Sequence, residues 1–172
     1  MTKLRLVLDT NVLVSGLLTQ NSIPQRIYDY AIAQATLLIS QATLLELERV
    51  LIRPKFDRYV SLEKRLRFIA SFVTRAEHID ITESIALCRD PQDNHLLELA
   101  ACGSATHLIT GDQDLLVLNS FREIFIPKTV RFFVGGKALK YTSQYFLIEI
   151  ADEDDTVYQG RIDSAAVGWV AR

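Results

Sequence analysis

Cysteine is scarce in this sequence, with only Cys88 and Cys102 among 172 residues. The two are not spaced as a metal-binding pair and both lie in apolar surroundings, so we expect reduced, buried thiols in a cytoplasmic protein. The chain also lacks an apolar run long enough to span a bilayer, and it does not open with the charged and apolar regions of a signal peptide. The sequence therefore predicts neither a membrane span nor a secreted, disulfide-stapled fold.

A strong excess of charge is absent as well, because the formal net charge is −2. No long-range field would draw nucleic acid to such a chain, so any nucleic-acid binding has to come from a local patch of basic residues. Internal repeats and low-complexity linkers are also missing. What is present is an ordinary globular composition, 49% hydrophobic and 23% charged, in a chain long enough to bury one core.

Short apolar runs alternate with longer helical patterns through most of the chain. The run from Leu4 to Leu8 is long enough for a buried strand and too short for a helix, and it stops at three polar residues. This alternation predicts an α/β fold with a mainly parallel sheet. The expected strands are 4–8, 36–39, 79–81 and 107–110, and the expected helices are 25–35, 43–53, 61–75, 96–101 and 115–118, with Gly103 ending the fourth helix.

The last part of the chain has a different pattern. Three strand-like segments, 131–134, 144–150 and 156–162, follow one another without helices, and the acidic run 152–155 is typical of a solvated loop. We therefore expect a first domain over residues 1–135 and a C-terminal, β-hairpin-like extension of unknown role over residues 136–172.

Several carboxylates lie at the ends of expected strands or on the helices that follow them. They are Asp9, Glu46, Asp93 and Asp112, with Asp90 and Asp114 as close neighbours. The carboxyl ends of parallel strands meet at one edge of a sheet, so these side chains can converge in one pocket. Clustered carboxylates repel unless a cation neutralises them, and Mg²⁺ binds through one or two carboxylates, waters and phosphate oxygens. The pattern indicates metal-assisted phosphoester hydrolysis.

Each of these carboxylates also has a purely structural interpretation. Thr43 and Glu46 have the spacing of a capping box, in which Glu46 would only bond back to the start of its own helix. Asp9, Asp93 and Asp112 can each cap the helix that follows. The local sequence leaves both interpretations open.

Three segments carry a resemblance to a known family. They are LVLDTNVLVSGLL near the start, ISQATLLELERVLIRPKF in the middle, and CRDPQDNHLLELA followed by LITGDQDLLVL. In this order and spacing the chain resembles the PIN-domain ribonucleases, most closely the toxin components of bacterial and archaeal toxin–antitoxin pairs, over residues 4–126. The resemblance implies a PIN-like α/β/α sandwich with a mainly parallel central sheet, and the β-rich extension lies beyond the matched part.

The resemblance also implies an acidic pocket that holds Mg²⁺ or Mn²⁺. Its catalytic and metal-binding residues would be Asp9, Glu46, Asp93 and Asp112, with Asp90 and Asp114 as further candidate ligands and Thr10, Asn11, Asn94 and Thr110 at the polar positions around them. Asn94 stands where relatives often have aspartate, so the third ligand could be shared along Asp90, Asp93 and Asn94.

The activity implied by this resemblance is metal-dependent cleavage of single-stranded RNA. The implied partners are RNA, a cognate antitoxin protein and a second copy of the chain in a homodimer. Two alternatives stay open: a DNA-directed nuclease of the flap-endonuclease type, and a non-catalytic PIN-like module that binds nucleic acid.

Basic residues follow the acidic position on the middle helix. Arg49 and Arg53 are candidate phosphate contacts, and Arg49 is the stronger one because it lies three residues past Glu46. A solvated face is the more common role for the wider basic set, which adds Lys55, Arg58, Lys64, Arg65 and Arg67. Among the histidines, His95 adjoins the pocket segment, but a surface position is the alternative and a metal–water mechanism does not need it.

Overall fold

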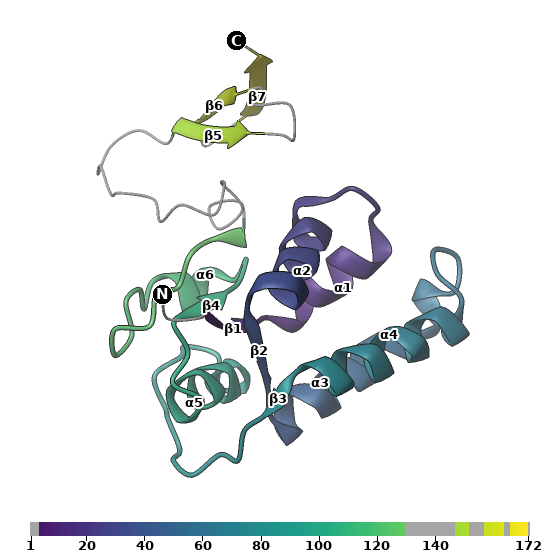
Figure 1. Cartoon of the computed structure of the whole chain (residues 1–172). Coiled ribbons are helices and arrows are strands. Elements are labelled where there is room, and N and C mark those ends of the chain that lie inside the picture. Colours follow the sequence, from purple (N-terminus) through teal and green to yellow (C-terminus); the bar gives the residue numbers. More distant parts are fainter. Residues whose placement is uncertain (1–3, 130–146, 152–156, 164–165, 172) are drawn as a thin grey trace. The chain divides into compact units, whose positions relative to one another are not determined.

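The computed structural model describes residues 4–129, 147–151, 157–163 and 166–171 (Figure 1). These residues belong to two compact units, Met1–Thr129 and Val130–Arg172. Within the described ranges, no helix has both the length and the apolar character needed to cross a bilayer.

The first unit is built on a parallel sheet of four strands in the order β3-β2-β1-β4 (Figure 1). The strands are β1 (Arg5–Leu8), β2 (Thr36–Ile39), β3 (Glu77–His78) and β4 (His107–Ile109). β1 is central, because Leu6 pairs with Leu37 of β2 on one side and with His107 of β4 on the other. The predicted α/β fold with a mainly parallel sheet is confirmed.

Helices make the crossovers between these strands. α1 (Thr10–Leu18) and α2 (Ile23–Gln34) connect β1 to β2. α3 (Gln41–Leu51), the 3₁₀ turn η1 (Pro54–Phe56) and α4 (Leu62–Arg75) connect β2 to β3. The 3₁₀ turn η2 (Pro91–Asp93) and α5 (Asn94–Cys102) lie between β3 and β4, and α6 (Gln113–Leu116) follows β4. In Figure 1 the strands lie between α1 and α2 on one side and α5 on the other, which is the expected layered arrangement.

The central strand is apolar on both faces because helices cover both faces of the sheet. Leu6 and Val7 point to opposite faces and are both 0% exposed. Leu97 of α5 is equally buried, and burying a leucine side chain contributes about 1.5–3 kcal/mol. Gly103 ends α5 as predicted, and a Cβ atom at this position would lie 2.7 Å from Cδ1 of Leu38. Glycine therefore lets α5 pack closely against β2.

Several predicted boundaries differ from the structure by one to three residues, and local contacts explain two of them. α3 begins at Gln41 rather than Thr43, because Ser40 is its N-cap and forms a capping box with Thr43. β3 occupies Glu77–His78 rather than 79–81, since the register with β2 ends at the pair Ile39–His78. The amide of Ile79 still donates a hydrogen bond of 2.8 Å to the carbonyl of Ile39. The strand therefore ends three residues earlier than its apolar pattern indicates.

Arg65 of α4 is fully buried, at 0% exposed. Its guanidinium donates hydrogen bonds to the carbonyl oxygens of Leu51, Arg53 and Val60, and it forms an ion pair with Asp57. The first two carbonyls belong to the C-terminal end of α3, where helical carbonyls have no intrahelical partner. The expectation that Arg65 lies on a solvated or phosphate-binding face is therefore wrong, because its charge is used to join α3 to α4.

The second unit is an antiparallel sheet in the order β5-β6-β7. Its strands are β5 (Leu147–Ala151), β6 (Val157–Asp163) and β7 (Ala166–Ala171), with β6 paired to both neighbours. β5 and β6 overlap the predicted strands 144–150 and 156–162, while β7 is not predicted by the sequence pattern. The expected strand 131–134 lies outside the described residues, and the domain boundary after residue 135 stays a prediction.

Candidate active site

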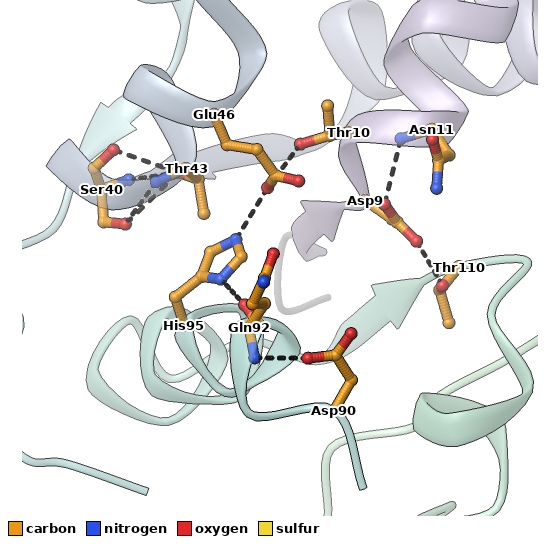
Figure 2. A network of polar contacts seen from close by, with 10 residues as sticks. All are labelled: Asp9, Thr10, Asn11, Ser40, Thr43, Glu46, Asp90, Gln92, His95 and Thr110. Atoms are coloured by element: carbon orange, nitrogen blue, oxygen red, sulfur yellow. Dashed lines mark hydrogen bonds and ion pairs between the residues drawn. The ribbon is translucent and has the colours of Figure 1, made fainter. Parts of the chain in front are cut away.

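The candidate site begins where β1 and β4 end side by side. β1 connects to β2 on one flank while β4 pairs on the other, so the order of the strands reverses at this point, where ligands bind in open α/β sheets. Asp9 follows β1 and is only 6% exposed. Its Oδ1 accepts a hydrogen bond from the Asn11 amide at 3.0 Å and its Oδ2 accepts one from the Thr110 hydroxyl at 2.5 Å (Figure 2).

Thr110 connects Asp9 to the next acidic residue. It is 0% exposed, and its Oγ1 also accepts a hydrogen bond of 2.9 Å from the amide of Asp112. Asp112 is in turn the N-cap of α6, where its Oδ1 accepts from the Asp114 amide at 2.7 Å. One buried hydroxyl therefore fixes the ends of β1 and β4 and the start of α6 relative to one another.

Glu46 reaches the same edge from α3. Figure 2 shows its carboxylate between Thr10 of α1 and His95 of α5. Oε2 accepts hydrogen bonds from the Thr10 hydroxyl at 3.0 Å and from Nε2 of His95 at 2.9 Å. The capping box of α3 is instead formed by Ser40 and Thr43, so the structural interpretation of Glu46 as a helix cap is wrong.

His95 is the site residue whose role the sequence did not reveal. Its Nε2 contacts Glu46, and its Nδ1 contacts the carbonyl oxygen of Gln92. Burial alone lowers the pKa of His95, but the hydrogen bonds to Glu46 and Gln92 and the charges of Glu46 and Asp93 outweigh burial and raise that pKa. The same hydrogen bond from His95 holds the pKa of Glu46 below its ordinary value. The pair is therefore a half-buried ion pair rather than a surface contact.

Asp93 occupies the N-cap position of α5, yet its side chain makes no capping hydrogen bond. Burial and the charges of Asp112, Asp90 and Asp9 together raise the pKa of Asp93 to about 6, while the charge of His95 opposes them. Asp9 and Asp112 are far from Asp93 in the sequence, so their effect on this carboxyl indicates that the fold brings them near it. The sequence expectation that Asp93 merely caps α5 does not describe its side chain.

The surroundings of Asp9 also change its pKa. Burial raises its pKa most, the hydrogen bonds from Thr110 and Asn11 lower it, and the charges of Glu46 and Asp112 raise it. The net effect is a pKa above the ordinary value. Asp9 and Asp112 therefore combine a capping hydrogen bond with a place in an acidic cluster. The capping interpretation of these two residues is confirmed, and their functional role stays a prediction.

The remaining candidates lie at the margin of this cluster. Asp90 caps η2 by accepting from the Gln92 amide at 2.9 Å, and Asp114 forms an ion pair with Arg89. Oδ1 of Asn94 accepts hydrogen bonds from the amides of Leu87 and Cys88, so it supports the loop before η2. Asn94 is thereby committed to the backbone rather than to a ligand.

The two arginines proposed to contact substrate are both exposed. The charge of Arg49 lowers the pKa of Glu46, which places it within electrostatic reach of the site. The carbonyl of Arg53 accepts hydrogen bonds from Arg65 and from the amide of Phe56, so its backbone lies in the turn that follows α3.

The donor chemistry of the cluster suits a hard divalent cation. Within the described residues, no three His, Cys, Asp or Glu side chains are grouped closely enough to hold a metal ion by themselves. Mg²⁺ does not require such a cage, because it keeps several waters and binds directly through one or two carboxylates. Carboxylates whose pKa values are raised by neighbouring carboxylates, such as Asp9 and Asp93, supply the uncompensated negative charge that such an ion neutralises.

An acidic cluster at the switch point of a parallel sheet is a candidate site for metal-assisted chemistry, and the comparison with known families identifies the class of protein. The sequence model of the PIN domain matches residues 5–114. This chain therefore belongs to the PIN-domain family, whose members are generally nucleases that use divalent metal ions.

Three individual proteins are similar to this chain. An uncharacterized protein of Methanocaldococcus jannaschii is 31% identical over 118 residues, which cover 67% of this chain and 76% of that protein. The crystal structure of VapBC2 from Rickettsia felis bound to a DNA fragment from their promoter has a similar fold, with a TM-score of 0.51 and 15% identity over 73% of this chain and 98% of that one. A crystal structure of a Pyrobaculum aerophilum protein aligns with a TM-score of 0.48 and 15% identity, covering 75% of this chain and 86% of that one.

The raised pKa of Asp93 predicts a stability change in the metal-free protein. A folded-state pKa of about 6 means that Asp93 contributes stability below its unfolded pKa and that this contribution is lost as the pH rises through 6. Asp93→Asn should therefore raise the Tm in EDTA at pH 7.5 by about 2–4 °C, after discounting for solvent screening. Thermal denaturation from pH 5 to 7.5 measures this.

The control for Asp93→Asn is Asp80→Asn, the same change at an exposed position. It should leave both the Tm and its pH dependence unchanged. An equal or lower Tm for Asp93→Asn at pH 7.5 would contradict the electrostatic repulsion described here.

Proposed function

We propose that this protein is a divalent-metal-dependent endoribonuclease that cleaves single-stranded RNA and acts as the toxin of a toxin–antitoxin pair. The observation that carries the proposal is that Thr110 joins Asp9 to Asp112 at the ends of β1 and β4, while the charges of both carboxylates raise the pKa of Asp93. Membership of the PIN-domain family supports a nuclease with this kind of site.

In this proposal, Asp9, Glu46, Asp93 and Asp112 hold Mg²⁺ or Mn²⁺, with Asp90 and Asp114 at the margin. The bound metal supplies the activation of water and the neutralisation of charge on the phosphodiester. The surrounding residues of the chain orient the ligands: Thr110 and Asn11 fix Asp9, and Thr10 fixes Glu46. Hydrolysis in line with the scissile bond would leave a 3′-hydroxyl and a 5′-phosphate.

The proposed substrate contacts are Arg49 and Arg53, which are exposed and follow Glu46 on the chain. Each phosphate contact adds one released counterion, so its loss weakens binding at all sequences and reduces the salt dependence. Arg49→Ala should weaken binding of a single-stranded RNA several-fold and lower the slope of log affinity against log salt by about 0.7. Fluorescence anisotropy at several salt concentrations measures both quantities.

A matched control for Arg49→Ala is Arg67→Ala, whose side chain is 68% exposed on α4. It should leave RNA affinity and its salt slope unchanged. If both variants lose the same affinity, the effect comes from overall charge and Arg49 is not a specific phosphate contact.

The proposed protein partners are a cognate antitoxin and a second copy of the chain. Large hydrophobic side chains on or near α3 and α4 remain exposed, namely Leu45, Ile52, Tyr59, Leu62 and Leu66. Several such residues on one helical pair support a protein partner in this region, since an apolar patch on a monomer often marks an interface. The antitoxin is the partner that the proposed function requires there.

Cleavage of a mixed single-stranded RNA pool tests the proposed function. The protein, purified free of antitoxin, is incubated with Mg²⁺, Mn²⁺ or EDTA, beside a single-stranded DNA pool and beside the Asp9→Asn variant. We expect RNA cleavage with metal, and none with EDTA or with the variant. Preferential cleavage of DNA would favour a flap-type nuclease, and RNA binding without cleavage would favour a non-catalytic module.

A further inference from the structure

The imidazole ring of His95 joins two parts of the candidate site that are far apart in sequence. Its Nδ1 contacts the carbonyl oxygen of Gln92, the residue immediately before Asp93. Its Nε2 lies 2.9 Å from Oε2 of Glu46 on α3. The rigid ring therefore connects the backbone beside Asp93, one candidate ligand, to the side chain of Glu46, another candidate ligand.

This contact also determines how the Glu46 carboxylate is used. Oε2 receives both hydrogen bonds, one from His95 and one from the Thr10 hydroxyl at 3.0 Å. Among the described contacts, none involves Oε1 of Glu46. The side chain of Glu46 is 29% exposed, so it is not enclosed in the core. Two donors on one oxygen fix the plane of the carboxylate and leave the other oxygen for a ligand.

We propose that His95 is a positioning residue, which holds Glu46 at a fixed distance from Asp93 so that Oε1 of Glu46 faces the bound cation. This inference rests on the proposed metal-dependent function and names a residue that this function did not require. The role resembles that of outer residues in metal sites generally, which orient the ligands and whose loss typically weakens metal affinity by about 10–100-fold.

A purely structural role is the competing explanation. In that case His95 would only stabilise the start of α5 through its contact with Gln92, and its contact with Glu46 would be incidental. Two substitutions separate these contacts. In His95→Gln the amide nitrogen lies near the position of Nε2, so this variant keeps the donor toward Glu46. In His95→Asn the amide nitrogen lies near the position of Nδ1, so this variant keeps the donor toward Gln92.

The experiment measures Mn²⁺ binding to the full-length, metal-free protein without substrate. Binding is followed by the loss of the electron paramagnetic resonance signal of free Mn²⁺. We expect His95→Asn to bind Mn²⁺ about tenfold or more weakly than the wild type, and His95→Gln to remain within about threefold of it. Melting temperatures in EDTA check that the two variants are equally folded.

The outcomes are distinguishable from one another. If His95→Asn binds Mn²⁺ as tightly as the wild type, His95 does not position Glu46 and the inference is wrong while the proposed function stands. If both variants bind equally weakly, the contact with Glu46 is not what matters, and the inference is also wrong. If the wild type itself binds no Mn²⁺, the proposed metal-dependent function fails and the inference fails with it.

Discussion

Replacing Asp9 with asparagine is expected to lower the rate of RNA cleavage by about 10²- to 10³-fold. Asp9 is the most buried carboxylate of the site, at 6% exposed, and it lies at the junction of β1 and β4. Asparagine retains the size and one oxygen of aspartate but removes the negative charge, and this charge is what a divalent cation requires of its ligand. The measurement is the single-turnover cleavage rate at saturating Mn²⁺.

The fold should survive this substitution. The remaining oxygen of asparagine can still accept from the Asn11 amide, and its amide group can donate to Thr110, whose hydroxyl has two lone pairs. Burial raises the pKa of Asp9, so a neutral group removes a repulsive charge from the cluster. The Tm of Asp9→Asn in EDTA should therefore equal or exceed that of the wild type.

Asp29→Asn, the same change at an exposed position of α2, is the matched control and should cleave at the wild-type rate. Full metal-dependent activity in Asp9→Asn would contradict the assignment of the acidic cluster as the catalytic site. A folded variant without activity, beside an active control, would support it.

Arg65→Ala is expected to cause the largest loss of stability, about 3–5 kcal/mol. The guanidinium is 0% exposed and donates to the carbonyls of Leu51, Arg53 and Val60, so its removal leaves the buried Leu51 carbonyl without this donor and a cavity behind. For a chain of this size such a loss lowers the Tm by about 10 °C. Urea denaturation followed by circular dichroism measures the free energy of unfolding.

Arg67→Ala is the natural comparison, since it lies two residues further along α4. Its side chain is 68% exposed and pairs with Glu63 across one helical turn at 3.2 Å. Exposed pairs of this kind contribute about 0.5 kcal/mol or less. Equal effects of the two substitutions would show that burial of Arg65 has no energetic consequence, contrary to its hydrogen bonds.

The fold could be predicted from the sequence because its signals are local. The apolar run before Asp9 and the one before Thr110 each have a pattern that predicts a strand. A polar residue follows each of these strands. Parallel pairing then follows from the alternation of strands and helices. The strand at Glu77–His78 could not be located because both residues are exposed, so hydrophobic periodicity carries no signal there.

The site was predictable only in part, for a physical reason. Carboxylates at strand ends are visible in the sequence, whereas the partner of a side chain is not. Glu46 fits a capping box in its local sequence, and only the fold shows that Ser40 takes that role and that Glu46 contacts His95, 49 residues away. The prediction for Arg65 was wrong for the same reason, because the sequence pattern of a basic residue on an amphipathic helix indicates a solvated side chain and does not show its acceptors.

The hydrogen bond between Asp9 and Thr110 also has a consequence for protein synthesis. It joins residues 101 positions apart, and the amide of Asp9 bonds to the carbonyl of Ile109 beside it. A ribosome makes Asp9 about a hundred residues before β4, the strand that completes its surroundings. A chain interrupted before β4 carries Asp9, Glu46 and Asp93 but not Thr110 and Asp112, so an unfinished copy has an incomplete acidic cluster.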